Sequence, residues 1–200
     1  MKIIGVTGGV GSGKSALLNK IKENYNCEVI FSDNVANDIK KKGMIGYDKI
    51  VSLLGEDILI SEGDCVGEID KKKMAAKIFN DKVLLQKVND ILHPLTKEYI
   101  LNQIDLLKKE NKIDFLFIEA ALLIESGYNK IVDEMWYIYA DEDTRRVRLK
   151  SARGYSDEKI DSILKAQLSD KEYRQNSDFI VDNSRSLEDS LKQIEKRLIK

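Results

Sequence analysis

Residues 8–15 of this chain read Gly-Gly-Val-Gly-Ser-Gly-Lys-Ser, and they decide its fold. The stretch matches G-x-x-x-x-G-K-[ST], a pattern in which a glycine-rich loop wraps its backbone N–H groups around phosphates. An apolar run over residues 2–7 predicts a strand before the loop, and Leu17, Leu18 and Ile21 recur after it at helical spacing. Strand, loop and helix in that order form the context in which this pattern binds a nucleotide.

The loop assigns phosphate chemistry to particular residues. Its glycines allow the backbone to curl around an anion without Cβ clashes, and the next helix directs its N-terminus at the phosphates. We expect Lys14 to reach the β- and γ-phosphates and the Ser15 hydroxyl to reach Mg²⁺. The other loop residues predicted to bind the nucleotide are Gly9, Gly11, Ser12 and Gly13. The alternative is a glycine-rich turn that binds no ligand.

Composition limits the classes of protein to which this chain can belong. Its 200 residues suffice for one domain with inserted subdomains, and a hydrophobic content of 42% supplies a core. The net charge of −1 argues against a dedicated nucleic-acid binder. The longest apolar stretch, residues 115–124, contains Glu119 and is too short to span a bilayer. Cys27 and Cys65 form no C-x-x-C pair and no signal peptide precedes the first strand, so we expect a cytoplasmic protein without a membrane partner.

Short apolar runs alternate with helical patterns along the chain. Each run is typical of a strand that is buried on both faces, and the alternation predicts an α/β fold in which helices cover both faces of a parallel five-stranded sheet. The predicted strands cover residues 2–7, 28–31, 115–118, 135–140 and 179–182.

Two helical insertions interrupt the alternation. Residues 33–111 form the first, in which Pro94 is expected to open a new helix after an interruption at His93. Residues 142–177 form the second, with a loop at residues 153–156. The single domain therefore divides into these two insertions and a nucleotide-binding core, whose predicted ranges are 1–32, 112–141 and 178–200.

Carboxylates follow two strands of the predicted sheet. Asp33 comes just after the second strand and Glu119 ends the third, and ligands of open parallel sheets bind beyond the carboxyl ends of the strands. Asp33 is a candidate base that orients an acceptor hydroxyl and takes its proton, or it caps a helix that starts near Asn34. Glu119 is a candidate for holding Mg²⁺ through water, or a buried hydrogen-bond acceptor. Glu125 is a weaker candidate for metal or substrate.

The second insertion opens with several arginines. Arg145 and Arg148 share one helix face, and a mobile lid that carries arginines is suited to neutralising charge on a transferred phosphoryl group. The alternative is a solvated cationic face. Gln167 places an amide on an apolar helical stripe, where it either forms hydrogen bonds across the lid or lies at its margin. Local sequence around His93, the only histidine, favours a structural hydrogen bond at a helix boundary.

Taken in order, these residues resemble the dephospho-CoA kinase family. Residues 6–15 are close to the family's T-G-G-[IV]-G-S-G-K-S, and residues 119–125 resemble its D-x-P-L-L-x-E. Further matching elements are Ser32-Asp33, His93-Pro94-Leu95, Ala166-Gln167 and Val181-Asp182-Asn183. The resemblance runs nearly end to end, and the ordered set is more specific than the loop alone, which identifies only a nucleotide-binding superfamily.

The resemblance implies a three-layer P-loop NTPase fold with a helical CoA-binding insertion and a helical lid. It implies transfer of the ATP γ-phosphoryl group to the ribose 3′-hydroxyl of dephospho-CoA, giving CoA and ADP in the last step of coenzyme A synthesis, with Mg²⁺ as cofactor. We expect a monomer or weak homo-oligomer. The implied catalytic residues are Asp33 as base, Lys14 and Arg148. The implied substrate-binding residues are Asp33, His93, Leu122 and Glu125, and Ala16 and Asn183 join the ATP-binding set.

Several positions depart from the family pattern. Phe31 stands where the family has the first acid of its D-x-D element, and Ala16 replaces a usual threonine. Arg148 fits the first of two lid arginines, but Ala152 occupies the second position and Arg153 follows one residue later. These departures leave open which cation serves as the second one of the lid.

Two other functions fit parts of the sequence. A related nucleoside or nucleotide kinase would share the fold and differ in its acceptor. A GTP-driven binding switch would need D-x-x-G, which residues 64–67 supply without a convincing buried strand before them. It would also need N-K-x-D, for which residues 129–133 have one residue too many. The predicted function is therefore an ATP-dependent kinase of dephospho-CoA.

Overall fold

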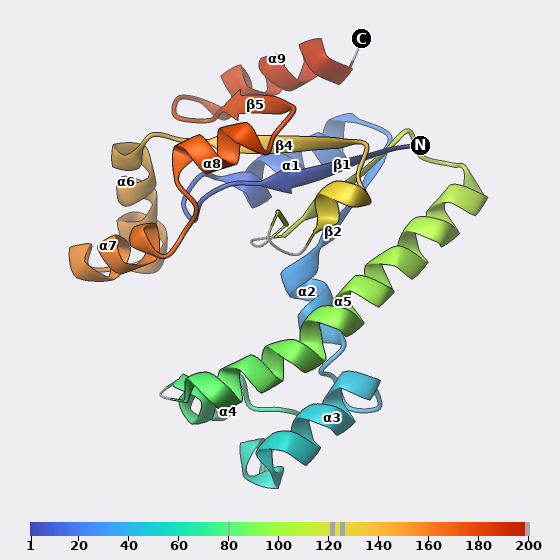
Figure 1. The fold of residues 1–200 in the computed structure, drawn as a ribbon, viewed down its shortest axis with the longest axis vertical. Helices are drawn as coiled ribbons and strands as arrows, with labels where there is room; N and C mark the ends of the chain where they lie inside the picture. The colour runs from blue at the N-terminus through green and yellow to red at the C-terminus, as the bar shows by residue number, and fades with distance from the viewer. Residues whose placement is uncertain (80, 121–122, 125–126, 199–200) are drawn as a thin grey trace. The chain divides into compact units, whose positions relative to one another are not determined.

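The computed structural model describes the whole chain except residues 80, 121–122, 125–126 and 199–200 (Figure 1). The chain divides into two compact units. The first contains residues 1–30 and 111–200, and the second contains residues 31–110. The break near residue 31 and the return near residue 110 lie close to the ends predicted for the first helical insertion, 33 and 111.

A five-stranded sheet forms the centre of the first unit. Its spatial order is β2-β3-β1-β4-β5, and β1 pairs in parallel with β3 and β4, as does β4 with β5. The predicted parallel α/β sheet is therefore confirmed, with strand ends within two residues of those expected. The strands are β1 (Lys2–Thr7), β2 (Cys27–Phe31), β3 (Phe115–Glu119), β4 (Glu134–Tyr139) and β5 (Phe179–Asp182).

The central strand β1 is buried along nearly its whole length, because β3 and β4 flank it and the layers above and below cover it. Aromatic rings reinforce the sheet: Trp136 packs edge-on against Phe117 and Phe179, with ring centroids 5.5 and 5.1 Å apart. Such T-shaped pairs add stability beyond the burial of their area. The rigid sheet fixes the place where β1 ends and the glycine-rich loop begins.

Two features of the helices in this unit match the sequence analysis. Leu17, Leu18 and Ile21 are the buried side chains of α1, as the helical spacing indicated. Gly154 ends α6 in a left-handed conformation and Ser156 caps α7, which confirms the loop expected between them. The α-helices are α1 (Lys14–Asn24), α6 (Glu142–Arg153), α7 (Asp157–Lys165), α8 (Asp170–Gln175) and α9 (Leu187–Leu198), and a short 3-10 turn is η2 (Tyr128–Lys130).

The second unit is built from helices around a separate apolar core. Its elements are α2 (Ser32–Asp38), α3 (Ile45–Leu54), η1 (Glu56–Ile58), α4 (Lys71–Phe79) and α5 (Lys82–Glu110). The buried side chains that form this core are Ile50, Leu54, Ile58, Met74, Val88 and Leu92.

One expectation about this unit is wrong. Pro94 does not open a new helix after an interruption at His93, because α5 continues through both residues for 29 residues (Figure 1). An interior proline removes one N–H donor and crowds the preceding turn, at a cost of about 3 kcal/mol. The helix continues because α5 packs against α2, α3 and α4, and buries Leu92 before the proline and Ile100 after it. Tertiary packing here outweighs the local preference.

Two isoleucines of α3 test whether this core stabilises the second unit. Ile50 is fully buried in the core, whereas the Ile45 side chain is 58% exposed. Ile50→Ala should lower the free energy of unfolding by about 2–5 kcal/mol, because it leaves a cavity. Ile45→Ala should change it by no more than about 0.5 kcal/mol. Urea titration followed by circular dichroism measures both, and equal effects would contradict the assigned core.

Candidate active site

The glycine-rich loop lies between β1 and α1, as the sequence predicted. Gly8, Gly11 and Gly13 all have positive φ angles, a conformation that a residue with Cβ rarely adopts. Gly13 is the N-cap of α1, so Lys14 and Ser15 open the helix. The strand–loop–helix context of the phosphate-binding pattern is thus present.

Backbone N–H groups of the loop are available to an anion. Across the described residues, no protein acceptor takes the N–H groups of Gly11, Gly13, Ser15 or Ala16, whereas the Ser12 N–H donates to the Gly9 carbonyl at 3.1 Å. Ala16 and Ser15 lie in the exposed first turn of α1, where the helix dipole favours negative charge. This arrangement suits a phosphate chain.

Two buried hydroxyl groups accompany the loop. Thr7 and Ser12 are each 1% exposed, and neither hydroxyl oxygen has a hydrogen-bond partner among the described residues. Buried polar groups without a partner are costly and uncommon in folded proteins. Their position on either side of the first glycines adds two unused polar groups to the candidate phosphate site.

Lys14 lies across the loop. Its Nζ donates to the Gly8 carbonyl at 2.6 Å and to the Gly9 carbonyl at 3.3 Å, and it lies 3.8 Å from Oε1 of Glu119. Glu119 ends β3 and is 9% exposed, so its carboxylate is held at the end of the strand beside the lysine. The sequence predicted both residues for this site, and the structure brings them together.

Asn183 and Arg148 hold the carbonyl group of Ser12. The Asn183 amide donates to this oxygen at 2.7 Å and Arg148 Nη1 at 3.2 Å, while Arg148 Nη2 donates to the Asn183 carbonyl at 2.8 Å. Asn183 Oδ1 also accepts a 2.8 Å bond from Ser190, so both ends of this buried side chain are engaged within the protein. Both predicted residues therefore lie at the loop, and contact of Asn183 with adenine stays a prediction.

Arg145 and Gln167 hold Val10 in the same loop. Arg145 Nε donates to the Val10 carbonyl at 2.9 Å, and its Nη2 donates to Oε1 of Gln167 at 2.7 Å. The same Gln167 oxygen accepts the Val10 N–H at 3.2 Å. Of the two possibilities left open for Gln167, the hydrogen-bonding one is confirmed.

The other arginines of α6 have different surroundings. Arg146 forms ion pairs with Glu142, Asp157 and Asp161 and belongs to the solvated charged face of the helix. Arg153 is exposed and lies 5.9 Å from the Tyr155 ring. Arg145 and Arg148 are thus the α6 arginines that bind the loop in this structure.

Asp33 belongs to the second unit, in the exposed first turn of α2. The alternative that it caps a helix starting near Asn34 is wrong, because α2 begins at Ser32 and Phe31 is its N-cap. Burial lowers the pKa of the neighbouring Lys40; the charge of Lys71 lowers it further and Asp33 raises it. The Asp33 carboxylate therefore lies close enough to Lys40 to favour its charged form.

The remaining predicted substrate residues are described only in part. His93 is exposed within α5, so the interpretation of a helix-boundary residue is wrong: packing carries the helix through it. Leu122 and Glu125 lie outside the described residues. No role for these side chains follows from the structure.

The chain offers few protein ligands for a metal. Within the described residues no group of three histidine, cysteine, aspartate or glutamate side chains converges. Mg²⁺ commonly binds proteins through one or two side chains together with substrate phosphates. The donor set of Ser15 and Glu119 beside a phosphate-binding loop fits that mode, with the phosphates supplying other ligands.

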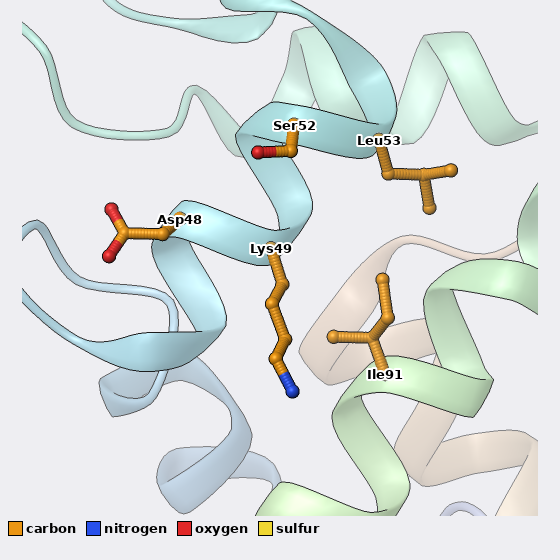
Figure 2. A pocket seen from close by; sticks show the side chains of 5 residues that line it. All are labelled: Asp48, Lys49, Ser52, Leu53 and Ile91. Carbon is orange, nitrogen blue, oxygen red and sulfur yellow. The ribbon is translucent and has the colours of Figure 1, made fainter.

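One further surface feature carries no assigned role. The second unit has a shallow cavity of about 440 Å³. Figure 2 shows the Lys49 side chain beside Ile91 of α5, with Leu53 of α3 above them and Asp48 pointing away to the left.

Over the described residues, every helix is too short or too polar to cross a membrane.

Sequence reasoning missed the contact of Arg145 with the loop. The sequence placed Arg145 on the same helix face as Arg148 but gave it no partner, because arginine clusters usually form solvated faces. The polar Gln167 within an apolar stripe was the only local signal, because a buried amide requires hydrogen-bond partners. Its partners, Val10 and Arg145, lie 157 and 22 residues earlier in the chain, and only the folded chain identifies them.

Comparisons with known proteins agree with this geometry. A family model described as dephospho-CoA kinase matches residues 2–189. The dephospho-CoA kinase of Aquifex aeolicus is 34% identical over 197 residues, which cover 98% of this chain and 95% of the relative. That of Carboxydothermus hydrogenoformans is 31% identical over 194 residues, covering 97% and 91%.

Solved structures give the same result. Dephospho-CoA kinase from Campylobacter jejuni has a TM-score of 0.71 and 26% identity, covering 100% of this chain and 98% of the other. TT1252 from Thermus thermophilus has a TM-score of 0.78 at 24% identity, covering 99% and 96%, and supports the fold. Because the family model spans nearly the whole chain and relatives above 30% identity cover it end to end, this chain belongs to the dephospho-CoA kinase family.

Proposed function

We propose that this protein transfers the γ-phosphoryl group of ATP to the ribose 3′-hydroxyl of dephospho-CoA, giving CoA and ADP. The observation that carries the proposal is an intact phosphate-binding loop at residues 8–15 in a chain that matches the dephospho-CoA kinase model over residues 2–189. Residues 33–111 would bind dephospho-CoA, and residues 142–177 would act as a lid.

Phosphoryl transfer requires positioning and charge stabilisation more than covalent participation of the protein. The N–H groups of Gly11, Gly13, Ser15 and Ala16 would bind the phosphate oxygens, because they donate to no protein group across the described residues. Lys14 would exchange its loop carbonyls for the β- and γ-phosphates.

The metal and the base complete the proposed reaction. Bound Mg²⁺ would neutralise phosphate charge, and Ser15 together with Glu119 would hold it. Asp33, directly after β2, would orient the 3′-hydroxyl of the acceptor and accept its proton. His93, and Leu122 and Glu125 outside the described residues, would contribute to acceptor binding.

The alternatives are less well supported. The D-x-x-G candidate at residues 64–67 lies in turns of the second unit, and Asn129 and Lys130 lie in η2, so a guanine-dependent switch lacks its expected strand ends. A nucleoside or nucleotide kinase would phosphorylate a different acceptor, and an assay with several acceptors distinguishes it from a dephospho-CoA kinase.

We also infer that the protein is a cytoplasmic monomer or weak homo-oligomer that has no nucleic acid as partner. Free Cys27 and Cys65 support a reducing compartment.

The acceptor assay tests the function directly. ADP release should be fast only when ATP, Mg²⁺ and dephospho-CoA are all supplied, and much slower with nucleosides or nucleoside monophosphates. Analysis of the product should find the new phosphate on the ribose 3′-oxygen. Faster turnover with another acceptor would refute the proposed substrate, and activity with GTP but not ATP would refute the donor.

Lys14 tests the phosphate site. Lys14→Ala should both raise the KM for ATP and lower kcat, so that kcat/KM falls by about 100-fold or more. The reason is that the lysine neutralises negative charge on the phosphoryl group that is transferred. Lys20→Ala is the matched control, since Lys20 lies on α1 and its exposed ammonium group pairs with exposed Glu23. Steady-state kinetics measure both, and a normal Lys14→Ala enzyme would refute the assignment.

Asp33 tests the assignment of the base. Asp33→Asn should lower kcat by about 100-fold or more while the dissociation constant for ATP stays within about twofold. Asp38→Asn removes a carboxylate from the same helix, where it pairs with exposed Lys41, and should leave kcat unchanged. Equal kcat values for Asp33→Asn and the wild type would remove Asp33 as base.

A further inference from the structure

We propose that Arg145 and Gln167 are positioning residues, which fix the two peptide groups beside Val10 so that the Gly11 N–H is directed at the nucleotide phosphates. The inference deepens the proposed kinase function and rests on it. It concerns residues of α6 and of the segment after α7, far in sequence from the loop that they hold.

The first peptide group joins Val10 to Gly11. Its carbonyl oxygen accepts a bond from Arg145 Nε at 2.9 Å. The C=O and N–H of a trans peptide point in opposite directions, so the captured carbonyl turns the Gly11 N–H away from the arginine. That N–H donates to no protein group among the described residues, which leaves it for a phosphate oxygen.

The second peptide group joins Gly9 to Val10. Its N–H donates to Oε1 of Gln167 at 3.2 Å, and its carbonyl accepts from the Ser12 N–H and from Lys14. Gln167 Oε1 also accepts from Arg145 Nη2 at 2.7 Å. Val10, Arg145 and Gln167 therefore form a closed ring of three hydrogen bonds, in which each residue bonds both others.

The close approach of α6 depends on glycines in the loop. A Cβ on Gly9 would lie 2.3 Å from Arg145 Nη2, and a Cβ on Gly11 would lie 3.0 Å from the Arg145 carbonyl oxygen. Gly11 also has a φ of 85°. The absence of a side chain at Gly9 therefore leaves room for the Arg145 guanidinium group, and its absence at Gly11 leaves room for the Arg145 backbone.

Arg145 also differs from a surface arginine in its ion pairing. Among the described residues no carboxylate forms an ion pair with Arg145, whereas Arg146 beside it pairs with three. A guanidinium held at the loop by carbonyl oxygens keeps its positive charge near the phosphates. Preorganised donors of this kind stabilise charge without rearranging when the ligand arrives.

Substitution of each partner tests the inference, with ADP binding measured by calorimetry and kinetics measured in parallel. Gln167→Ala and Arg145→Lys should each weaken ADP binding and raise the KM for ATP by about tenfold, because each breaks the ring. The double variant should be little worse than either single one. The KM for dephospho-CoA should stay within twofold.

Two further variants sharpen the test. Gln167→Glu retains an oxygen acceptor for both the Val10 N–H and Arg145, but its carboxylate also pairs with the Arg145 charge, so it should bind ADP more tightly than Gln167→Ala and less tightly than the wild type. Arg146→Lys makes the same exchange on the same helix away from the loop and should leave the KM for ATP unchanged.

The outcomes distinguish the inference from its alternatives. If Gln167→Ala lowers the melting temperature while the dissociation constant for ADP stays at the wild-type value, the ring is only a structural brace and the inference is wrong. Fully additive losses in the double variant would also overturn it. If the wild type binds ADP but fails to phosphorylate dephospho-CoA, the proposed function fails, while ADP binding by the variants still decides the inference.

Discussion

Capture of loop carbonyl groups by side chains is the interaction on which the candidate site depends. Lys14 holds those of Gly8 and Gly9, Arg145 holds that of Val10, and Arg148 with Asn183 holds that of Ser12. In a trans peptide each captured carbonyl sends the following N–H in the opposite direction. The N–H groups that follow the Val10 and Ser12 carbonyls, those of Gly11 and Gly13, are thereby left for phosphate among the described residues, whereas the Val10 N–H donates to Gln167.

This arrangement explains why glycine is needed at particular positions rather than throughout the loop. Gly13 has a φ of 87°, and a Cβ there would lie 2.5 Å from the Asn183 amide nitrogen. Glycine is needed at this position for two reasons: its backbone conformation favours glycine, and the Asn183 amide leaves no room for a methyl group. The Asn183 amide needs this closeness, because it reaches past Gly13 to the Ser12 carbonyl.

The two compact units contain the residues for different parts of the proposed reaction. The sheet unit contains the phosphate-binding loop, Glu119 and the arginines of α6, all held by a buried parallel sheet. The helical unit contains Asp33 and His93, and has a core of its own around Ile50 and Leu92. Donor chemistry and acceptor chemistry are thus assigned to parts of the chain that are stabilised separately.

The sequence by itself determined the parallel sheet, the loop and the helix after it, because apolar periodicity and glycine spacing are local properties of the chain. It also indicated Lys14, Glu119 and Arg148, whose motifs fix their place relative to a strand end or a helix start. It failed at Pro94, where packing of α5 against three helices outweighs the local cost of proline.

Only the tertiary structure decided which arginines hold the loop and what Gln167 binds. Arg145 and Arg146 are neighbours on one helix, yet Arg145 contacts the Val10 carbonyl and Arg146 contacts carboxylates of α6 and α7. Their side chains point in different directions from α6: the Val10 carbonyl lies 135 residues from Arg145 in the sequence, and Asp161 lies 15 residues from Arg146. Such long-range hydrogen bonds depend on how the helix is placed against the loop, and that placement is a property of the folded chain.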